Sequence, residues 1–152
     1  MQSTTFGRPF IKLFTLAILC ITVLSFTAKF GLDSYEIYLN NQLVLKQSVN
    51  QPLSLRKLPL SKATGGDQLR VYYRHCQSPH VGTGRGIALK DEKGNLLKKW
   101  TFSNATGSDL SMVIPVKELL QLRKAHAQQT LSLYYTATEL PGETTLAFLQ
   151  FK

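Results

Sequence analysis

The chain of 152 residues is predicted to be all-β. The expected fold is an antiparallel β-sandwich of about eight short strands with one short connecting helix. Three observations predict it. Apolar and polar residues alternate along most of the chain, which places the apolar residues on one face of each strand. Turn residues separate these runs at short intervals. Only one segment has the spacing of apolar residues that is typical of a helix.

The N-terminal segment has the layout of a secretory signal peptide. Residues 1–28 contain two basic residues and no acidic one, followed by an apolar run over 13–26. Because a bilayer span takes about 20 apolar residues, this shorter run predicts cleavage, after Ala28, rather than a retained signal anchor. Lipidation of Cys20, as in bacterial lipoproteins, is a further alternative. Leu19 stands where lipidation requires a small residue, so Cys20 is predicted to be an apolar member of the run.

Residues 29–152 are predicted to form a single basic domain. Loss of the signal removes two of the 18 basic residues and none of the 9 acidic ones, which changes the net charge from +9 to +7. A positive surface attracts phosphate, anionic lipid or acidic polysaccharide. Because the basic residues are scattered and the protein is exported, nucleic acid is not expected as a partner. One cysteine, Cys76, is left, so no intrachain disulfide can form.

Two hairpins and four further strands account for most of the domain. The first hairpin, residues 35–47, turns at Asn-Asn-Gln, and the second, residues 86–102, turns at DEKGN. The other strands are LSLRKL at 53–58, QLRVYYRH at 68–75, TLSLYYTAT at 130–138 and TTLAFLQF at 144–151. In QLRVYYRH the apolar residues share one face, and Arg70, Tyr72 and Arg74 share the other.

One helix is predicted over residues 114–126. Pro115 is expected at its first position, and four later residues follow the i, i+3, i+4, i+7 spacing: Val116, Leu119, Leu120 and Arg123. We expect this helix to cover one end of the sandwich rather than to bind a membrane.

The two halves of the domain resemble each other. Each half has a hairpin, a segment that begins with Leu-Ser, and a strand with a Tyr-Tyr pair. This order suits a pseudo-symmetric sandwich, although matches of this length support the fold only weakly.

Residues 74–80, RHCQSPH, contain a candidate metal site. Its ligands would be His75, Cys76 and His80. Cysteine and histidine bind copper and zinc. In an unbroken strand, however, His75 and Cys76 point to opposite faces, so they converge on one ion only if the strand ends there. The charges of Arg74 and Arg85 also oppose a cation. A copper- or zinc-binding, or thiol-reactive, exported protein is therefore the alternative function.

Enzymatic and nucleotide-binding signals are weak. The glycine-rich segment 82–86, GTGRG, precedes a strand, whereas nucleotide-binding loops open a helix whose N-terminus holds the phosphate. The acidic residues lie mostly in turns, and the one adjacent nucleophile and base are Cys76 and His75. Catalysis needs these groups hydrogen-bonded to each other, which adjacency does not ensure. The chain is therefore not predicted to be an enzyme, and no cofactor is expected.

Four residues are candidates for ligand binding: Arg74, Arg85, Tyr72 and Tyr134. Tyr72 and Tyr134 lie opposite the apolar face of their strands, where exposed rings can stack on sugars, although tyrosine also simply fits a half-buried sheet. Arg85 and its loop could hold an anion with backbone N–H groups. A contiguous exposed aromatic or basic patch on one sheet would favour a binding role, whereas scatter of Arg70, Tyr72, Arg74 and Tyr134 would oppose it.

The predicted function is an exported, non-catalytic binding or interaction module of a bacterial cell envelope, located in the periplasm or at the cell surface. Its partner is expected to be a protein or an anionic or glycan component of the envelope. Membrane contact is expected only during export or through a retained signal.

Overall fold

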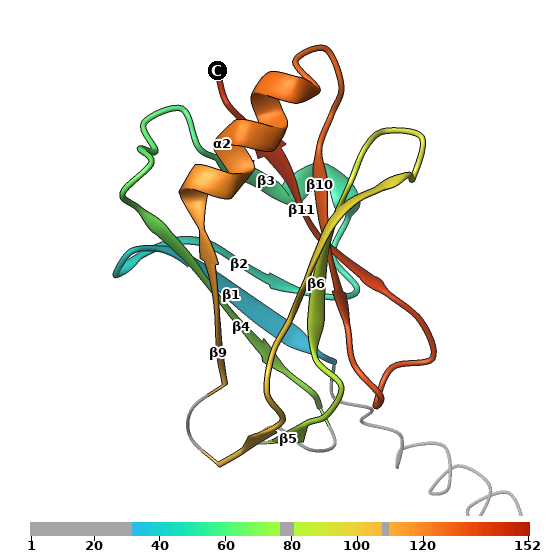
Figure 1. The fold of residues 1–152 in the computed structure, drawn as a ribbon. Helices are drawn as coiled ribbons and strands as arrows, with labels where there is room; N and C mark the ends of the chain where they lie inside the picture. Colours follow the sequence, from blue (N-terminus) through green and yellow to red (C-terminus); the bar gives the residue numbers. More distant parts are fainter. Residues whose placement is uncertain (1–31, 77–80, 108–109) are drawn as a thin grey trace, which may run out of the picture. The chain divides into compact units, whose positions relative to one another are not determined.

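The computed structural model describes residues 32–76, 81–107 and 110–152. These residues form a β-sandwich of two sheets rich in antiparallel pairs, which confirms the predicted fold class (Figure 1). The predicted signal peptide, including Cys20, lies outside the described residues, and so does His80. In the three described ranges, no helix has both the length and the hydropathy needed to span a membrane.

The first sheet has four strands, all paired antiparallel. They are β1 (Ser34–Leu39), β2 (Gln42–Ser48), β4 (Gln68–Arg74) and β9 (Ser111–Pro115). Their order is β2-β1-β4-β9, and β1 and β2 form the first predicted hairpin. Asn40 closes this hairpin with a φ of 55°, a left-handed conformation that asparagine tolerates better than most residues. The Asn40 side chain also accepts a hydrogen bond from the Gln68 backbone N–H at 2.9 Å, which ties the turn to β4.

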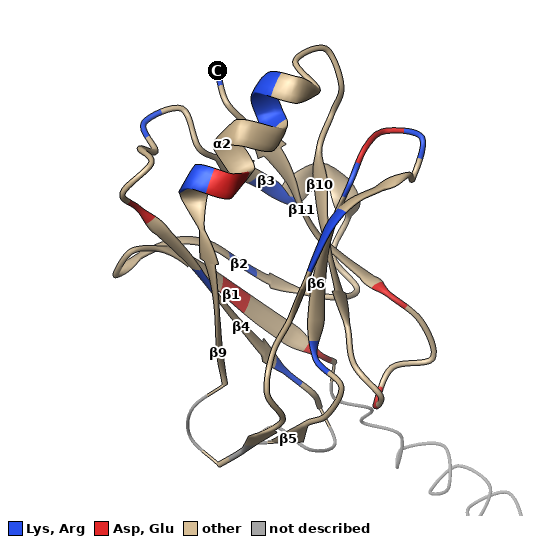
Figure 2. Ribbon diagram, viewed as in Figure 1, with Lys and Arg blue, Asp and Glu red and all other residues tan. Residues whose placement is uncertain are grey.

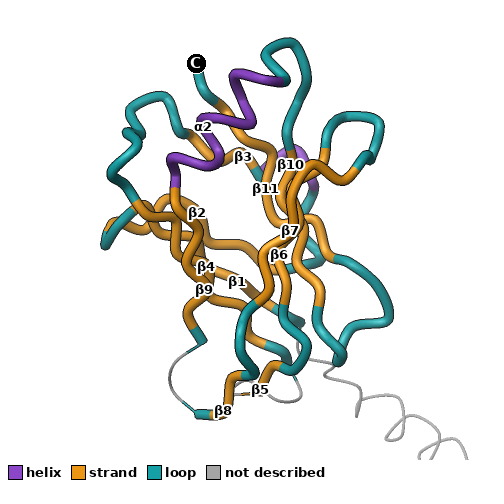
Figure 3. The backbone as a smooth tube through the Cα atoms, viewed as in Figure 1, coloured by secondary structure: helices purple, strands orange, loops and turns teal. Residues whose placement is uncertain are grey.

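The second sheet packs against the first and has five strands (Figure 3). They are β3 (Lys57–Pro59), β6 (Gly86–Lys90), β7 (Leu96–Thr101), β10 (Ser132–Thr136) and β11 (Thr144–Gln150). Their order is β3-β11-β10-β6-β7, and only the β3–β11 pair among them is parallel. Two short strands, β5 (Val81–Gly82) and β8 (Ala105–Thr106), pair with each other.

Inward-facing side chains of the two sheets form the core. The rings of Tyr73 on β4 and Tyr135 on β10 stack across it, with centroids 4.1 Å apart and planes at 24°. Both tyrosines are buried, and burial raises the pKa of Tyr135 to about 12. Offset stacking of this kind adds to the stabilisation from apolar burial.

Two of the three parts of the predicted repeat occupy equivalent places, whereas the Leu-Ser segments differ: the first forms a short 3₁₀ helix and the second leads into β9. In the first sheet, the hairpin β1–β2 lies beside β4; in the second, the hairpin β6–β7 lies beside β10 in the same order. The Tyr-Tyr pair of each half is also used in the same way. Tyr73 and Tyr135 point into the core, whereas Tyr72 and Tyr134 are half-buried on the outer faces.

Segment 53–58, predicted to be a strand, is instead a short 3₁₀ helix, η1 (Leu53–Leu55), followed by β3. The cause is Arg56, which is buried and donates hydrogen bonds to the carbonyl oxygens of Val49, Gln51 and Thr145. These bonds draw the chain into a turn, so no strand can continue through it. Leu53 and Leu55 of η1 are about half exposed, so the alternation of apolar and polar residues in this segment did not indicate a buried face.

The predicted helix is α2 (Val116–Ala125). It starts one residue later than expected, because Pro115 still pairs with Gln68 in the sheet and serves as the N-cap. Figure 1 shows α2 across one end of the sandwich. The Trp100 indole N–H on β7 donates to Glu118 at 2.8 Å, which fastens the helix to the second sheet.

Candidate functional site

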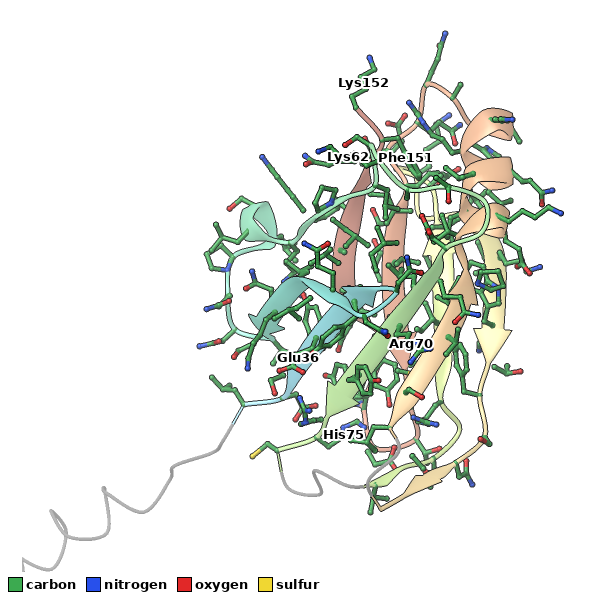
Figure 4. The ribbon with its side chains drawn as sticks, turned by 90° about the vertical axis from the view of Figure 1, so that its left-hand side faces the viewer. Glu36, Lys62, Arg70, His75, Phe151 and Lys152 are labelled. Carbon is green, nitrogen blue, oxygen red and sulfur yellow. The ribbon has the colours of Figure 1, made fainter. Side chains whose placement is uncertain are left out.

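The outer face of the first sheet carries the clearest candidate site. Along β4, Leu69, Val71 and Tyr73 are buried, so the alternating residues Arg70, Tyr72 and Arg74 point outward. In register with them on β1, Glu36 lies opposite Tyr72, and Tyr38 lies opposite Arg70. Figure 4 shows Glu36 and Arg70 on neighbouring strands of this face.

These side chains surround a hollow of about 280 Å³, called here the outer-face hollow. Its lining residues come from β1, the β1–β2 turn and β4: Glu36, Tyr38, Asn40, Asn41, Arg70, Tyr72 and Arg74. Arg70, Tyr72 and Arg74 are therefore contiguous and half-buried, whereas Tyr134 lies on the other sheet.

Glu36 organises the hollow. Its Oε1 lies 2.9 Å from the Lys46 ammonium, and its Oε2 lies 3.3 Å from the Arg74 guanidinium and accepts a hydrogen bond from the Tyr38 hydroxyl at 3.1 Å. The hydrogen bond from Lys46 contributes most to lowering the pKa of Glu36, and those from Tyr38 and Arg74 add to it. Glu36 is therefore ionised at neutral pH and holds Tyr38 and Arg74 in place.

Two tyrosines provide the aromatic part of the hollow. The rings of Tyr38 and Tyr72 meet edge to face, with centroids 5.5 Å apart. Both rings are half-buried, so each still presents surface to solvent. Partial burial and the hydrogen bond to Glu36 raise the pKa of Tyr38, so its hydroxyl stays protonated.

Arg70 is the basic residue of the hollow without a fixed partner. Its Nε is buried and has no hydrogen-bond acceptor among the described residues. Across the same residues, no carboxylate forms an ion pair with it. On strands β1, β2 and β4 the described cations Lys46, Arg70 and Arg74 thus outnumber the one carboxylate, Glu36, and Figure 2 shows more blue than red on these strands. Since the Arg70 guanidinium has no carboxylate partner among these residues, an anion bound in the hollow would give it one.

His75, the first of the proposed metal ligands, is buried and already has neighbours at both ring nitrogens. Nδ1 lies 3.3 Å from Asp33 Oδ2, and Nε2 lies 3.3 Å from the Tyr135 hydroxyl. Glu139 is also close, with its Oε2 3.8 Å from Nε2. Burial acts to raise the pKa of Glu139, but hydrogen bonds from Thr83 hold it below its usual value. His75 is therefore held between two acidic side chains on opposite sides of its ring.

Cys76 is exposed, and its backbone N–H donates to Asp33 Oδ1 at 2.8 Å. His80, the third proposed ligand, lies outside the described residues. Within ranges 32–76, 81–107 and 110–152, no group of three histidine, cysteine or acidic residues is arranged to hold a metal ion.

Arg85 and Tyr134 lie apart from the outer-face hollow. Arg85 is only 5% exposed, and its guanidinium donates to the backbone oxygens of Ser103 and Leu110 at 2.8–2.9 Å. Tyr134 is on the outer face of the second sheet, where the Lys90 ammonium lies 5.0 Å from its ring centroid. Of the four predicted ligand-binding residues, the structure brings together Arg74 and Tyr72.

Five residues of the hollow were not among the predicted site residues: Glu36, Tyr38, Asn40, Asn41 and Arg70. The alternation in β4 already placed Arg70 beside Tyr72 and Arg74, so that signal was present in the sequence. Glu36 and Tyr38 join the site only through the pairing of β1 with β4, which no local pattern specifies.

The chain matched no protein-family model, no curated protein sequence and no solved structure. Its function therefore has to be inferred from the chemistry of these residues.

Proposed function

We propose that the chain is an exported, non-catalytic binding module of a bacterial cell envelope, and that it binds an anionic partner in the outer-face hollow. The observation that carries the proposal is that Arg70 lines the hollow without a carboxylate partner among the described residues, beside Tyr38 and Tyr72. A guanidinium edge binds two oxygens of a carboxylate, sulfate or phosphate. An adjacent ring adds stacking area for a sugar or another flat group.

The same residues favour binding over catalysis. Among the described residues, Glu36 is the one carboxylate that lines the hollow, and three donors already occupy it. Because its pKa is lowered, Glu36 has no proton to give as a general acid at neutral pH. In the part of the chain that the structure describes, no serine, cysteine or histidine that could act as a nucleophile or base lines the hollow.

We do not propose the copper- or zinc-binding alternative as a second function. Both ring nitrogens of His75 already face hydrogen-bonding neighbours, and its burial separates it from the exposed Cys76.

The test is binding of the full-length chain to immobilised anionic polymers: heparin, polygalacturonate, hyaluronan and polyphosphate, with neutral dextran as the negative control. We expect at least one anionic polymer to bind and dextran not to bind. Arg70→Gln should weaken that binding about tenfold, which is the low end of what a charge-assisted hydrogen bond contributes.

Lys99→Gln is the matched control, because it removes one charge from an exposed position of β7 on the other sheet. It should change the affinity less than about twofold. Tyr72→Ala should weaken binding, and Tyr134→Ala, at the equivalent outward position of β10, should not. If no anionic polymer binds, or if Arg70→Gln and Lys99→Gln have equal effects, the proposal is wrong.

A further inference from the structure

The outward residues of β4 form a row in which two arginines flank one aromatic ring. Side chains on one face of a strand repeat every second residue, at about 3.3 Å per residue. The Cα atoms of Arg70 and Arg74 are therefore about 13 Å apart along the strand, with Tyr72 midway. A small ligand with one acidic group would use only one of these arginines. The row instead matches an extended ligand with two acidic groups on either side of an uncharged unit.

The hollow itself also fits part of a long molecule better than a whole small one. Small-molecule pockets enclose about 300–1,000 Å³ and bury most of the ligand. The outer-face hollow is about 280 Å³ and lies on a sheet face whose lining residues are half-buried or exposed. The Arg74 side chain is 43% exposed, so a ligand can reach it.

The charge on this face is positive but sparse. Glu36, paired with Tyr72 across the strands, offsets part of the charge of Lys46 and Arg74. A polymer with a negative charge on every unit would bring an anion close to Glu36, where like charges repel. A polymer whose acidic units alternate with neutral ones would place each anion at an arginine and a neutral unit at Tyr72.

From this row we infer that the ligand is an extended polysaccharide with a carboxylate on every second sugar, and that it lies along β4. The two carboxylates meet Arg70 and Arg74, and the intervening neutral sugar packs against Tyr72. This inference rests on the proposed function and names its ligand class. Sugar hydroxyls also suit the neutral groups of the hollow, the Tyr38 hydroxyl and the Asn41 amide. A single nucleic-acid strand, which carries a charge on each nucleotide, fits the row less well.

The test measures how tightly hyaluronan oligosaccharides bind to the full-length chain, by titration calorimetry. Acidic and neutral sugars alternate in these oligosaccharides. The hexasaccharide spans the row, whereas the disaccharide has one carboxylate and reaches one arginine. We expect the hexasaccharide to bind at least about tenfold more tightly than the disaccharide. The methyl ester of the hexasaccharide should not bind. Arg70→Gln and Arg74→Gln should each lower the hexasaccharide affinity to near that of the disaccharide, and Lys99→Gln should not.

Because Arg74→Gln also removes a partner of Glu36, Arg74→Lys is made in parallel and should retain part of the affinity. Circular dichroism checks that each variant is folded. Equal binding of disaccharide and hexasaccharide, or no effect of Arg74→Gln, would overturn the two-arginine row. If heparin, polygalacturonate or polyphosphate binds through Arg70 and the hexasaccharide does not, the ligand class is wrong and the proposed function stands. Tighter binding of single-stranded DNA than of the hexasaccharide would also reject the polysaccharide. If none of these ligands binds, both proposals fail.

Discussion

Arg85→Met is the substitution that most directly tests how this sandwich is held together at the β5–β6 loop. Methionine keeps the unbranched stem and removes the guanidinium. The change deletes three hydrogen bonds to two backbone oxygens, those of Leu110 and Ser103. It leaves the packing of the stem largely intact, so the measured effect reports on the polar contacts.

The magnitude follows from where these two oxygens lie. The bond to Leu110 is buried, so its carbonyl would be left without a donor, at a cost of about 2 kcal/mol. The bonds to Ser103 are partly buried, and water can replace them, so they add about 1 kcal/mol. Loss of the buried charge recovers part of its desolvation energy, so we expect a net cost of about 2–3 kcal/mol. For a domain of this size, the melting temperature should fall by about 10–15 °C.

The assay is urea and thermal unfolding of the full-length chain, followed by circular dichroism. Lys99→Met is the control, because it removes an exposed cation and should change the free energy of unfolding by less than about 0.5 kcal/mol. Arg85→Lys keeps the charge but offers fewer, differently placed donors and should fall between the two. An Arg85→Met variant as stable as the native chain would refute the reasoning, because desolvation of the guanidinium would then outweigh its hydrogen bonds.

Three further predictions concern the scaffold. Gly82→Ala should destabilise the fold by about 1–2 kcal/mol in urea unfolding, because an added Cβ would lie 2.7 Å from the immobilised Arg85 Cδ; an unchanged midpoint would contradict this. Trp100→Phe removes the hydrogen bond to the first turn of α2 and should cost about 1 kcal/mol, whereas no change would mean that the bond contributes nothing net. Hydrogen bonds from Asn95 lower the pKa of Asp91 in the folded chain. The stabilisation of the fold by ionised Asp91 is therefore fully present above the pKa of this carboxyl in the unfolded chain, and it is lost as the pH falls through its lower pKa in the folded chain. Asp91→Asn should therefore flatten the acid side of the stability–pH curve, and a curve parallel to the native one would exclude this role.

Much of the fold was predictable because the alternation of apolar and polar residues is a local property of the sequence. Both hairpins and the strands around the two Tyr-Tyr pairs follow from residues that are neighbours in sequence. Segment 53–58 could not be predicted in this way. Its shape depends on Arg56 bonding to Thr145, which is 89 residues away. The start of α2 was displaced for a similar reason, because Pro115 pairs with Gln68.

The candidate site was predictable only in part. Tyr72 and Arg74 lie on the outer face, as strand periodicity requires. Arg85 follows three residues of a glycine-containing loop, and nothing local indicates that it is buried. Its burial depends on backbone oxygens that lie 18 and 25 residues further along the chain. The contribution of Glu36 depends likewise on the register between β1 and β4.

The alternation along β4 has a consequence for how this protein can change over time. The inward residues, including Tyr73, belong to the core, whereas the outward residues Arg70, Tyr72 and Arg74 contribute little to it. A shift of the strand by one residue would exchange the two sets, so the register of β4 is under strong constraint. Within that register, however, each outward position can be substituted almost independently of folding. If the proposed function holds, point substitutions on this one strand can change the ligand specificity without a redesign of the interior.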